Sequence, residues 1–226
     1  MLLYKRMMKK ILLKKIYNLI RNNQIEIVLI GEIHGWDKSL EIERSFLQSL
    51  KPGLFLHELL EDYTIKPSDA KKILTKKKWM SKVHSFQELR QIFSLISTLK
   101  IIGKGHDMAS HGIKNIQNYY IKNRELTEKE EKDEQALIKR REDEQKEIIL
   151  KILNNEKPVI AISGSYHLRN NSHLIKSLKD KKMALIYPSI SGSPYNGKEN
   201  FQIDKMVYIA KFLNVKGLKE CLQVIG

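Results

Sequence analysis

Two tetrapeptides in this chain place a histidine three residues after a glycine, and each directly follows a short apolar run. The first is Gly-Glu-Ile-His at residues 31–34, and the second is Gly-Ser-Tyr-His at residues 164–167. Short continuous apolar runs are typical of strands buried in a parallel sheet, and α/β proteins bind their ligands at the carboxyl ends of such strands. The pattern therefore predicts that His34 and His167 can meet at one site.

Other apolar runs also end in side chains that can bind a metal ion. Strands are predicted at residues 26–30, 54–57, 100–103, 159–163 and 183–187. All but the last are followed by imidazoles or carboxylates: Glu32 and His34, His57 and Glu58, His106 and Asp107, and His167. If the strands are parallel, all these groups lie near one edge of the sheet. The last run offers only the phenol of Tyr187.

Such an edge supports metal binding or general-base chemistry. Imidazole and carboxylate groups together bind Zn²⁺, Mn²⁺ or Fe²⁺, and a site with three protein ligands keeps a position for water. A metal ion can lower the pKa of water to about 7, whereas without a metal a His–Glu pair can act as a general base. The glycine of each motif allows a tight turn and a close backbone approach. The residues alone leave both mechanisms open.

Not every histidine of the chain belongs to this expected site. A single Gly-x-x-His tetrapeptide is a weak signal, because such patterns arise by chance in chains of this size. His57 follows an apolar run and is most simply a packed residue. His106 and Asp107 point in opposite directions if their strand continues, so only one should face the site, and we select Asp107. The remaining histidines lie in helical or loop contexts typical of the surface: His84, His111 and His173.

The intervals between the apolar runs carry helical periodicity. One helix is expected after the first strand, beginning near Asp37 as its cap, and another over residues 86–99. A highly charged helix over 126–153 opens with a capping box at Thr127, and a shorter helix covers 173–178. This alternation of strands and helices predicts an α/β fold with a mainly parallel central sheet flanked by helices.

The whole alternation fits one domain. With 226 residues and 42% hydrophobic content the chain can bury one α/β core, and no linker rich in Pro, Gly or Ser divides it. We expect a basic amphipathic helix within residues 1–22, a core at 25–188 and a carboxyl-terminal extension at 189–226, with a candidate edge strand at 206–212. The helix is expected to dock on the body, with membrane-surface attachment as the alternative. Its apolar stripe comprises Tyr4, Met8, Ile11, Ile16 and Leu19.

The chain carries a net charge of +15, from 41 Lys and Arg against 26 Asp and Glu. Such a charge steers acidic partners toward a protein, so nucleic acid must be considered. The lysines are nevertheless spread along the whole chain, which disfavours a dedicated nucleic-acid site. No apolar run approaches the roughly 20 residues that cross a bilayer, and the single Cys221 suits a reducing compartment. We therefore expect a cytoplasmic protein without a membrane span.

Taken together, the motifs resemble those of the superfamily of Tiki/TraB, ChaN and erythromycin-esterase-like proteins. The resemblance rests on Gly-Glu-x-His at 31–34, on Glu58 at the end of the second strand and on Gly-x-x-His-Leu at 164–168. The similarity extends over about residues 25–188.

Two further positions match that pattern. The family carries an arginine on the helix before the last motif, which Arg140 or Arg141 matches, although the methionine that often follows one turn later is absent here. Asp107 resembles the acidic residue often found after the family's middle strand.

The resemblance implies an α/β fold with the motifs gathered in one cleft. Tiki-type members are regarded as divalent-metal-dependent proteases, and erythromycin-esterase members as hydrolases of macrolide esters that use His and Glu. ChaN-type members are membrane-anchored lipoproteins that bind haem. Because the chain shows neither a lipoprotein signal nor a hydrophobic anchor, haem is the less favoured cofactor.

We therefore predict a hydrolase that acts on a peptide, an ester or a small-molecule conjugate. The histidines and glutamates would be ligands or general base, and the arginine would stabilise the developing oxyanion. Two rival hypotheses are a non-catalytic haem- or metal-binding protein of the same fold and a basic nucleic-acid-binding protein. The predicted catalytic residues are Glu32, His34, Glu58, His167 and Arg141 (or Arg140). The predicted ligands for Mn²⁺, Co²⁺ or Zn²⁺ are His34, Glu58, His167 and Asp107.

Overall fold

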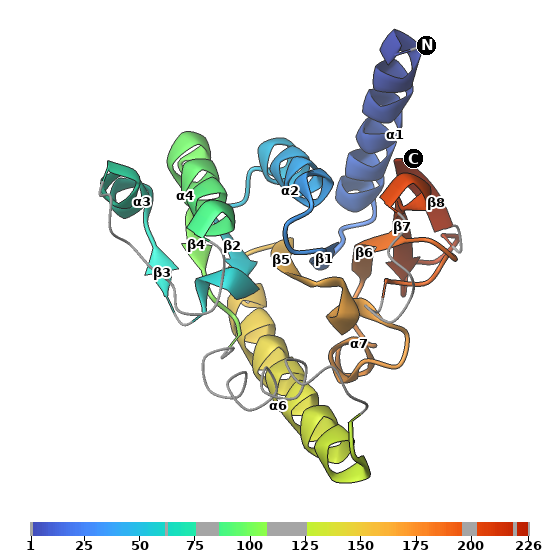
Figure 1. Ribbon diagram of the computed structural model, residues 1–226. Coiled ribbons are helices and arrows are strands. Elements are labelled where there is room, and N and C mark those ends of the chain that lie inside the picture. The colour runs from blue at the N-terminus through green and yellow to red at the C-terminus, as the bar shows by residue number, and fades with distance from the viewer. Residues whose placement is uncertain are drawn as a thin grey trace.

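A single mixed sheet forms the centre of the protein (Figure 1). The computed structural model describes residues 2–61, 63–75, 86–107, 126–195, 203–218 and 221–225. Within these residues eight strands follow the order β3-β4-β2-β5-β1-β6-β7-β8. Their bounds are β1 Ile27–Glu32, β2 Leu54–His57, β3 Thr64–Ile65, β4 Ile102–Lys104, β5 Val159–Gly164, β6 Met183–Ser189, β7 Val207–Leu213 and β8 Cys221–Ile225.

The five strands expected from the apolar runs form the parallel centre of this sheet. β4, β2, β5, β1 and β6 lie side by side, and all their pairings are parallel. β3, β7 and β8 add to the two sides as antiparallel strands. The apolar runs are continuous because both faces of the central strands are covered; every residue of β1 and β6 is buried. The predicted α/β fold with a mainly parallel sheet is confirmed.

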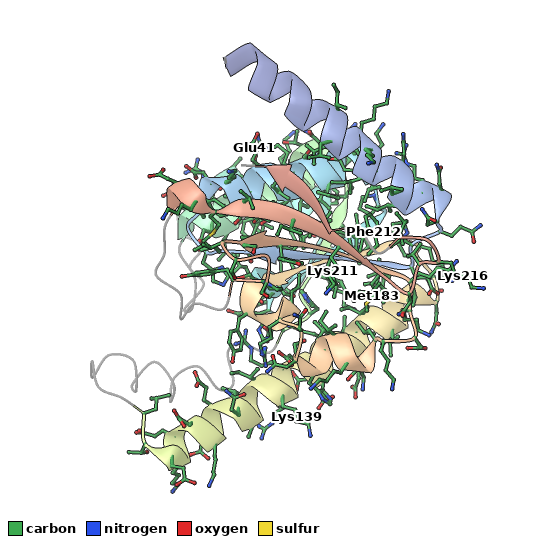
Figure 2. All side chains as sticks on the ribbon, turned by 90° about the vertical axis from the view of Figure 1, so that its right-hand side faces the viewer. Glu41, Lys139, Met183, Lys211, Phe212 and Lys216 are labelled. Atoms are coloured by element: carbon green, nitrogen blue, oxygen red, sulfur yellow. The ribbon has the colours of Figure 1, made fainter. Side chains whose placement is uncertain are left out.

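The helices cover the two faces of the sheet unequally. In Figure 1, α1 (Leu2–Asn22), α2 (Asp37–Leu50) and α4 (Phe86–Leu99) lie on one face, while α6 (Glu128–Leu153) and α7 (His173–Ser177) lie on the other. The short helix α3 (Pro67–Thr75) packs against α4. Seen from the side, the sheet lies between α1 and α6 (Figure 2). None of the helices in the described part of the chain is both long and apolar enough to cross a membrane.

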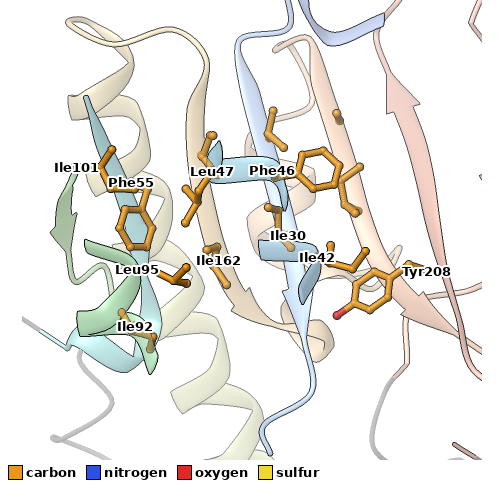
Figure 3. Close-up of a cluster of buried hydrophobic side chains, with 14 of the residues drawn as sticks. Ile30, Ile42, Phe46, Leu47, Phe55, Ile92, Leu95, Ile101, Ile162 and Tyr208 are labelled. Carbon is orange, nitrogen blue, oxygen red and sulfur yellow. The ribbon is translucent and has the colours of Figure 1, made fainter. Parts of the chain in front are cut away.

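Alternate residues of each central strand feed two separate cores. Val28 and Ile30 of β1 join the cluster under α1, α2 and α4, whereas Ile27 and Leu29 join the cluster against α6 and α7. Figure 3 shows Ile42, Phe46 and Leu47 of α2 packed over Ile30 and its neighbours on the adjacent strands. Burying one such side chain stabilises the fold by about 1.5–3 kcal/mol. The same alternation decides which face receives the polar residues at the strand ends.

The amino-terminal helix docks on the body, but not through the whole expected stripe. Of its residues 11–22, whose side chains the structure describes, Leu13, Ile16 and Ile20 are buried. Tyr17 adds a hydrogen bond to Ser45 of α2 at 2.7 Å. The assignment of Ile11 to the stripe was wrong, since its side chain is 55% exposed. The buried residues are spaced by three and then four positions, so they form a stripe on a different face of the helix from Ile11. Tyr4 and Met8 lie outside the side chains that the structure describes.

Several element boundaries differ from the expected ones. Asp37 is the first residue of α2 rather than its cap, which is Trp36 without a capping side-chain bond. The third strand begins at Ile102 instead of residue 100, because Lys100 has a φ of 56° and turns the chain after α4. The segment at 206–212 is strand β7 and is not an edge strand, because β8 pairs outside it. The capping box of Thr127 at the start of α6 is confirmed.

Candidate functional site

The carboxyl ends of β1, β2, β4 and β5 bring acidic and imidazole side chains into one continuous row. Glu58 is 3.0 Å from His34 (Oε1 to Nε2), and His34 in turn lies 3.6 Å from Glu32 (Nδ1 to Oε1). On the other side of Glu32 lies His57, at 3.9 Å (Oε1 to Nδ1), and His57 lies 3.5 Å from Glu43 (Nε2 to Oε2). At the other end, ligand atoms of Asp107 and His167 lie within 4.8 Å of Glu58. We call these residues the polar row: Asp107, His167, Glu58, His34, Glu32, His57 and Glu43.

The two Gly-x-x-His motifs lie side by side because β1 and β5 are parallel neighbours, with Glu32 opposite Gly164. The glycines permit this contact. A Cβ atom on Gly31 would lie 3.1 Å from the Cα atom of Ser165, and one on Gly164 would lie 3.1 Å from Oε1 of Glu58. The second glycine therefore leaves the space that the Glu58 carboxylate occupies. As predicted, both motif histidines reach one site, and both lie next to Glu58.

On the α6 side of the row, His167 is held by a buried carboxylate. Its Nδ1 lies 3.1 Å from Oε1 of Glu142. The same oxygen accepts a hydrogen bond from Arg169 at 2.7 Å, and Oε2 of Glu142 accepts one from the backbone N–H of His173 at 2.6 Å. Burial raises the pKa of Glu142, but the His167 bond and the His167 and Arg169 charges outweigh it and hold the pKa below its usual range. A carboxylate on Nδ1 favours the proton there, so Nε2 of His167 carries the lone pair.

Asp107 is held in a similar way by α6. Arg141 donates to both of its oxygens, from Nε to Oδ1 at 3.0 Å and from Nη2 to Oδ2 at 2.6 Å, and Gln145 donates to Oδ2 at 3.1 Å. Burial lowers the pKa of Arg141, but the bond to Asp107 outweighs it and the pKa is raised. Of the two candidate arginines, Arg141 lies at the row and Arg140 is exposed.

His106 turns away from the row, toward β5. Its Nε2 lies 2.8 Å from the Ser163 hydroxyl, and the side chain is fully buried. Burial lowers the pKa of His106 to about 4, so the imidazole is neutral at physiological pH. Asp107 rather than His106 therefore belongs to the candidate ligand set.

The α2 side of the row is built differently. Glu32, Glu43 and His57 are all buried, and no Lys or Arg among the described residues forms an ion pair with either carboxylate. Burial raises the pKa of Glu32 well above its usual range, and the charges of Glu43, Glu58 and Glu88 raise it further. His57 is packed, as its apolar setting suggests, and its Nδ1 accepts a hydrogen bond from the N–H of Leu59 at 3.2 Å.

Between the two sides, Glu58 and His34 form a pair that reaches solvent. Burial raises the pKa of Glu58, but the hydrogen bond from His34 and the charges of His34, His167 and Arg141 hold it well below its usual range. Burial lowers the pKa of His34, and the bond to Glu58 more than reverses that effect. The side chain of His34 is 46% exposed, whereas that of Glu58 is 4% exposed. Solvent therefore reaches the row at His34.

Three overlapping sets within the row could hold a metal ion. They are Glu32, His34 and Glu58; Glu58, Asp107 and His167; and Glu32, Glu43 and His57. Among the described residues, the buried side-chain atoms without a hydrogen-bond partner also gather here. Most of these atoms belong to the row itself: Glu32 Oε1, both oxygens of Glu43, His57 Nε2 and Glu58 Oε2. The other two are Nδ1 of His106, which precedes Asp107 in the sequence, and Oε1 of Gln145, whose Nε2 donates a hydrogen bond to Asp107. Buried orphan atoms are rare in native proteins, so their concentration here fits a site for cations.

The sequence reasoning missed two glutamates, Glu43 of α2 and Glu142 of α6. Each lies on the buried stripe of its helix, Glu43 one turn before Phe46 and Leu47, and Glu142 one turn after Ile138. A carboxylate that continues an apolar stripe was the signal that could have identified them. Among the histidines expected at the surface, His173 is only partly exposed and contacts Asp143 at 2.7 Å. His84 and His111 lie outside the described residues.

Comparison of the chain with protein-family models, with proteins of described function and with solved structures gives no match. The resemblance of the motifs to the Tiki, ChaN and erythromycin-esterase-like proteins therefore stays a prediction. The geometry of the polar row is the firmest guide to function.

Proposed function

We propose that this protein is a hydrolase that holds a divalent metal ion with Glu58, Asp107 and His167. The observation that carries the proposal is the position of Glu58. It lies in one ligand set with His167 and Asp107, and it also pairs with the solvent-exposed His34 at 3.0 Å. A buried ligand set is thus joined directly to a histidine that water and a substrate can reach.

Contacts behind the ligands support this assignment. In metal centres, a ligating histidine usually donates its other N–H to a carboxylate, and ligating carboxylates are themselves hydrogen-bonded. His167 has such a partner in Glu142, and Asp107 has two in Arg141 and Gln145. A mixed set of one imidazole and two carboxylates suits Zn²⁺, Mn²⁺ or Co²⁺. The site is therefore held in place by groups that do not themselves touch the ion.

The residues around the ion have distinct tasks. A bound divalent ion would supply positive charge that polarises water and a substrate carbonyl. His34 donates its Nε2 proton to Glu58, so Nδ1 is the basic nitrogen, and Glu58 strengthens that base by raising the pKa of His34. The guanidinium of Arg141 places a fixed positive charge beside the ligands, where it offsets the negative charge that develops on the carbonyl oxygen.

The reaction that these groups support is acyl transfer to water. The water oxygen attacks the carbonyl carbon while Nδ1 of His34 takes the water proton. The bond to the leaving oxygen or nitrogen then breaks, and His34 returns the proton to that atom. The products are a carboxylic acid and an alcohol or amine. The substrate is accordingly a peptide, an ester or a small-molecule conjugate, in line with the reaction classes that the motif resemblance implies.

A hydrolysis screen tests the proposal. The purified protein, loaded with Mn²⁺, Co²⁺ or Zn²⁺, is assayed on a panel of chromogenic esters and fluorogenic peptides beside the variants Glu58→Gln and His173→Ala. We expect metal-dependent turnover, a loss of at least about 100-fold in Glu58→Gln, and wild-type rates in His173→Ala, whose side chain contacts Asp143 outside the row.

Two results of that screen would count against the hydrolase. One is hydrolysis by Glu58→Gln at the wild-type rate. The other is the absence of turnover together with a Soret band on mixing with haem, which would favour the rival binding protein.

A further inference from the structure

The end of the polar row beneath α2 holds two buried carboxyl groups that no Lys or Arg of the described residues balances. Glu32 comes from the end of β1 and Glu43 from the middle of α2, and their side chains are 5% and 0% exposed. Ligand atoms of the two residues and of His57 lie within 4.8 Å of one another. No Lys or Arg in the described ranges pairs with either carboxylate, so neither has a permanent positive partner.

Among the described residues, three carboxylate oxygens at this end have no hydrogen-bond partner. They are both oxygens of Glu43 and Oε1 of Glu32. A buried ionised carboxylate without a partner is costly, because it loses its hydration and gains nothing in return. Two of them side by side also repel each other. The pair therefore needs a cation or a shared proton.

His57 lies beside this pair without neutralising it. Its Nδ1 accepts a hydrogen bond from the backbone N–H of Leu59 at 3.2 Å, so the neutral ring carries its proton on Nε2. That Nε2 points toward Oε2 of Glu43 at 3.5 Å, which is long for a hydrogen bond. The imidazole thus lies beside Glu43 without a hydrogen bond to it, and Oε1 of Glu43 and Oε1 of Glu32 have no hydrogen-bond partner among the described residues.

We propose that Glu32 and Glu43 bind a second divalent cation, separate from the ion at Glu58, Asp107 and His167. Its protein ligands are carboxylate oxygens, which favours a hard ion such as Mn²⁺ or Mg²⁺. Glu32 also lies in a set with His34 and Glu58, so the proposed second site would adjoin the first at Glu58. Only a catalytic use of this ion depends on the proposed hydrolase; its binding follows from the charges of Glu32 and Glu43.

Counting bound Mn²⁺ tests the second site. Metal-free protein is dialysed to equilibrium against Mn²⁺, and the bound metal is measured by elemental analysis for wild type, Glu43→Gln, His167→Ala and the control Glu41→Gln. Glu41 lies on the exposed face of α2 and is labelled in Figure 2. We expect two ions in wild type and in the control, and one ion in each of the other two variants.

The other outcomes separate this site from the hydrolase site. One ion in wild type that Glu43→Gln retains and His167→Ala loses overturns the second site and leaves the hydrolase intact, because the carboxylates then share a proton. If wild type binds one ion and only Glu43→Gln loses it, the second site is supported, and the hydrolase proposal loses the ion assigned to Glu58, Asp107 and His167. No bound ion overturns both. If Glu43→Gln fails to fold, as checked by circular dichroism, a wild-type count of one that His167→Ala loses still overturns the second site.

Discussion

The two sides of the polar row solve the same electrostatic problem in different ways. On the α6 side, Asp107 pairs with Arg141 and Glu142 pairs with Arg169, so each buried carboxylate has its own guanidinium. On the α2 side, Glu32 and Glu43 have no such partner among the described residues. The α6 side is therefore organised by the protein itself. We expect the α2 side to need a proton or a cation in addition.

The comparison separates a part of the site whose charges are fixed by arginines from a part whose charge can change with protonation or ion binding. A ligand set backed by arginines and by Glu142 keeps its geometry whether or not an ion is bound. A pair of unbalanced carboxylates is instead a place where ion binding relieves repulsion, so it contributes to stability when the ion arrives. Substitutions on the two sides should accordingly have opposite effects on the unfolding free energy of the metal-free protein.

The largest effect is expected from breaking an arginine pair on the α6 side. Arg141→Met leaves the buried Asp107 without its bidentate partner, which should cost about 3 kcal/mol of unfolding free energy. Urea denaturation of the metal-free protein measures it. The matched control is Arg140→Met, because Arg140 is exposed and should change stability by no more than about 0.5 kcal/mol. Equal stability of the two variants would contradict the pairing of Arg141 with Asp107.

A smaller effect is expected from the group behind His167. Glu142→Gln removes the carboxylate that holds the proton on Nδ1, so the affinity for the divalent ion should fall by about 10- to 100-fold. Isothermal titration with Zn²⁺ measures the change. Asp143→Asn, its neighbour on α6, contacts His173 instead and should bind the ion like wild type. An unaltered affinity in Glu142→Gln would show that the tautomer of His167 does not matter for binding.

The smallest effect, and one of opposite sign, is expected on the α2 side. Because the pKa of Glu32 is raised in the folded protein, its stabilising contribution is present below the unfolded pKa of about 4.3 and is lost as the pH rises through the folded pKa. Glu32→Gln cannot ionise and so avoids this loss of stability. At a pH above the folded pKa of Glu32, the metal-free variant should therefore be more stable than wild type by about 1 kcal/mol.

Thermal unfolding in a chelator, from pH 5 to pH 9, checks this prediction. The stability difference between Glu32→Gln and wild type should grow as the pH rises and then level off. A variant that is less stable than wild type across the whole range would mean that Glu32 is balanced by a partner after all.

The site residues on strand ends could be predicted from the pattern of strands, whereas the buried glutamates on helices were missed. Continuous apolar runs mark strands that are buried on both faces, and the carboxyl ends of parallel strands share one edge, so Glu58, Asp107 and His167 had to come together. Glu142 stands in a helix that is charged along most of its length. Its signal is its position on the buried stripe, one turn after Ile138, and the many charges of α6 obscure that stripe in the sequence.

The outer parts of the sheet escaped prediction for a related reason. β3 has only two residues, and β8 pairs along the far side of β7, so neither depends on an apolar run of its own. The docking face of α1 was misjudged at Ile11 because leucine, isoleucine and methionine occur around much of that helix, and the sequence alone does not choose among the possible stripes. Tertiary packing makes that choice.

The most direct test of the central claim is the position of a bound ion. Crystals of the protein soaked in Mn²⁺ would be measured for anomalous scattering at the manganese absorption edge. We expect a peak about 2 Å from ligand atoms of Glu58, Asp107 and His167. Anomalous peaks confined to surface carboxylates, with none between these three residues, would contradict it.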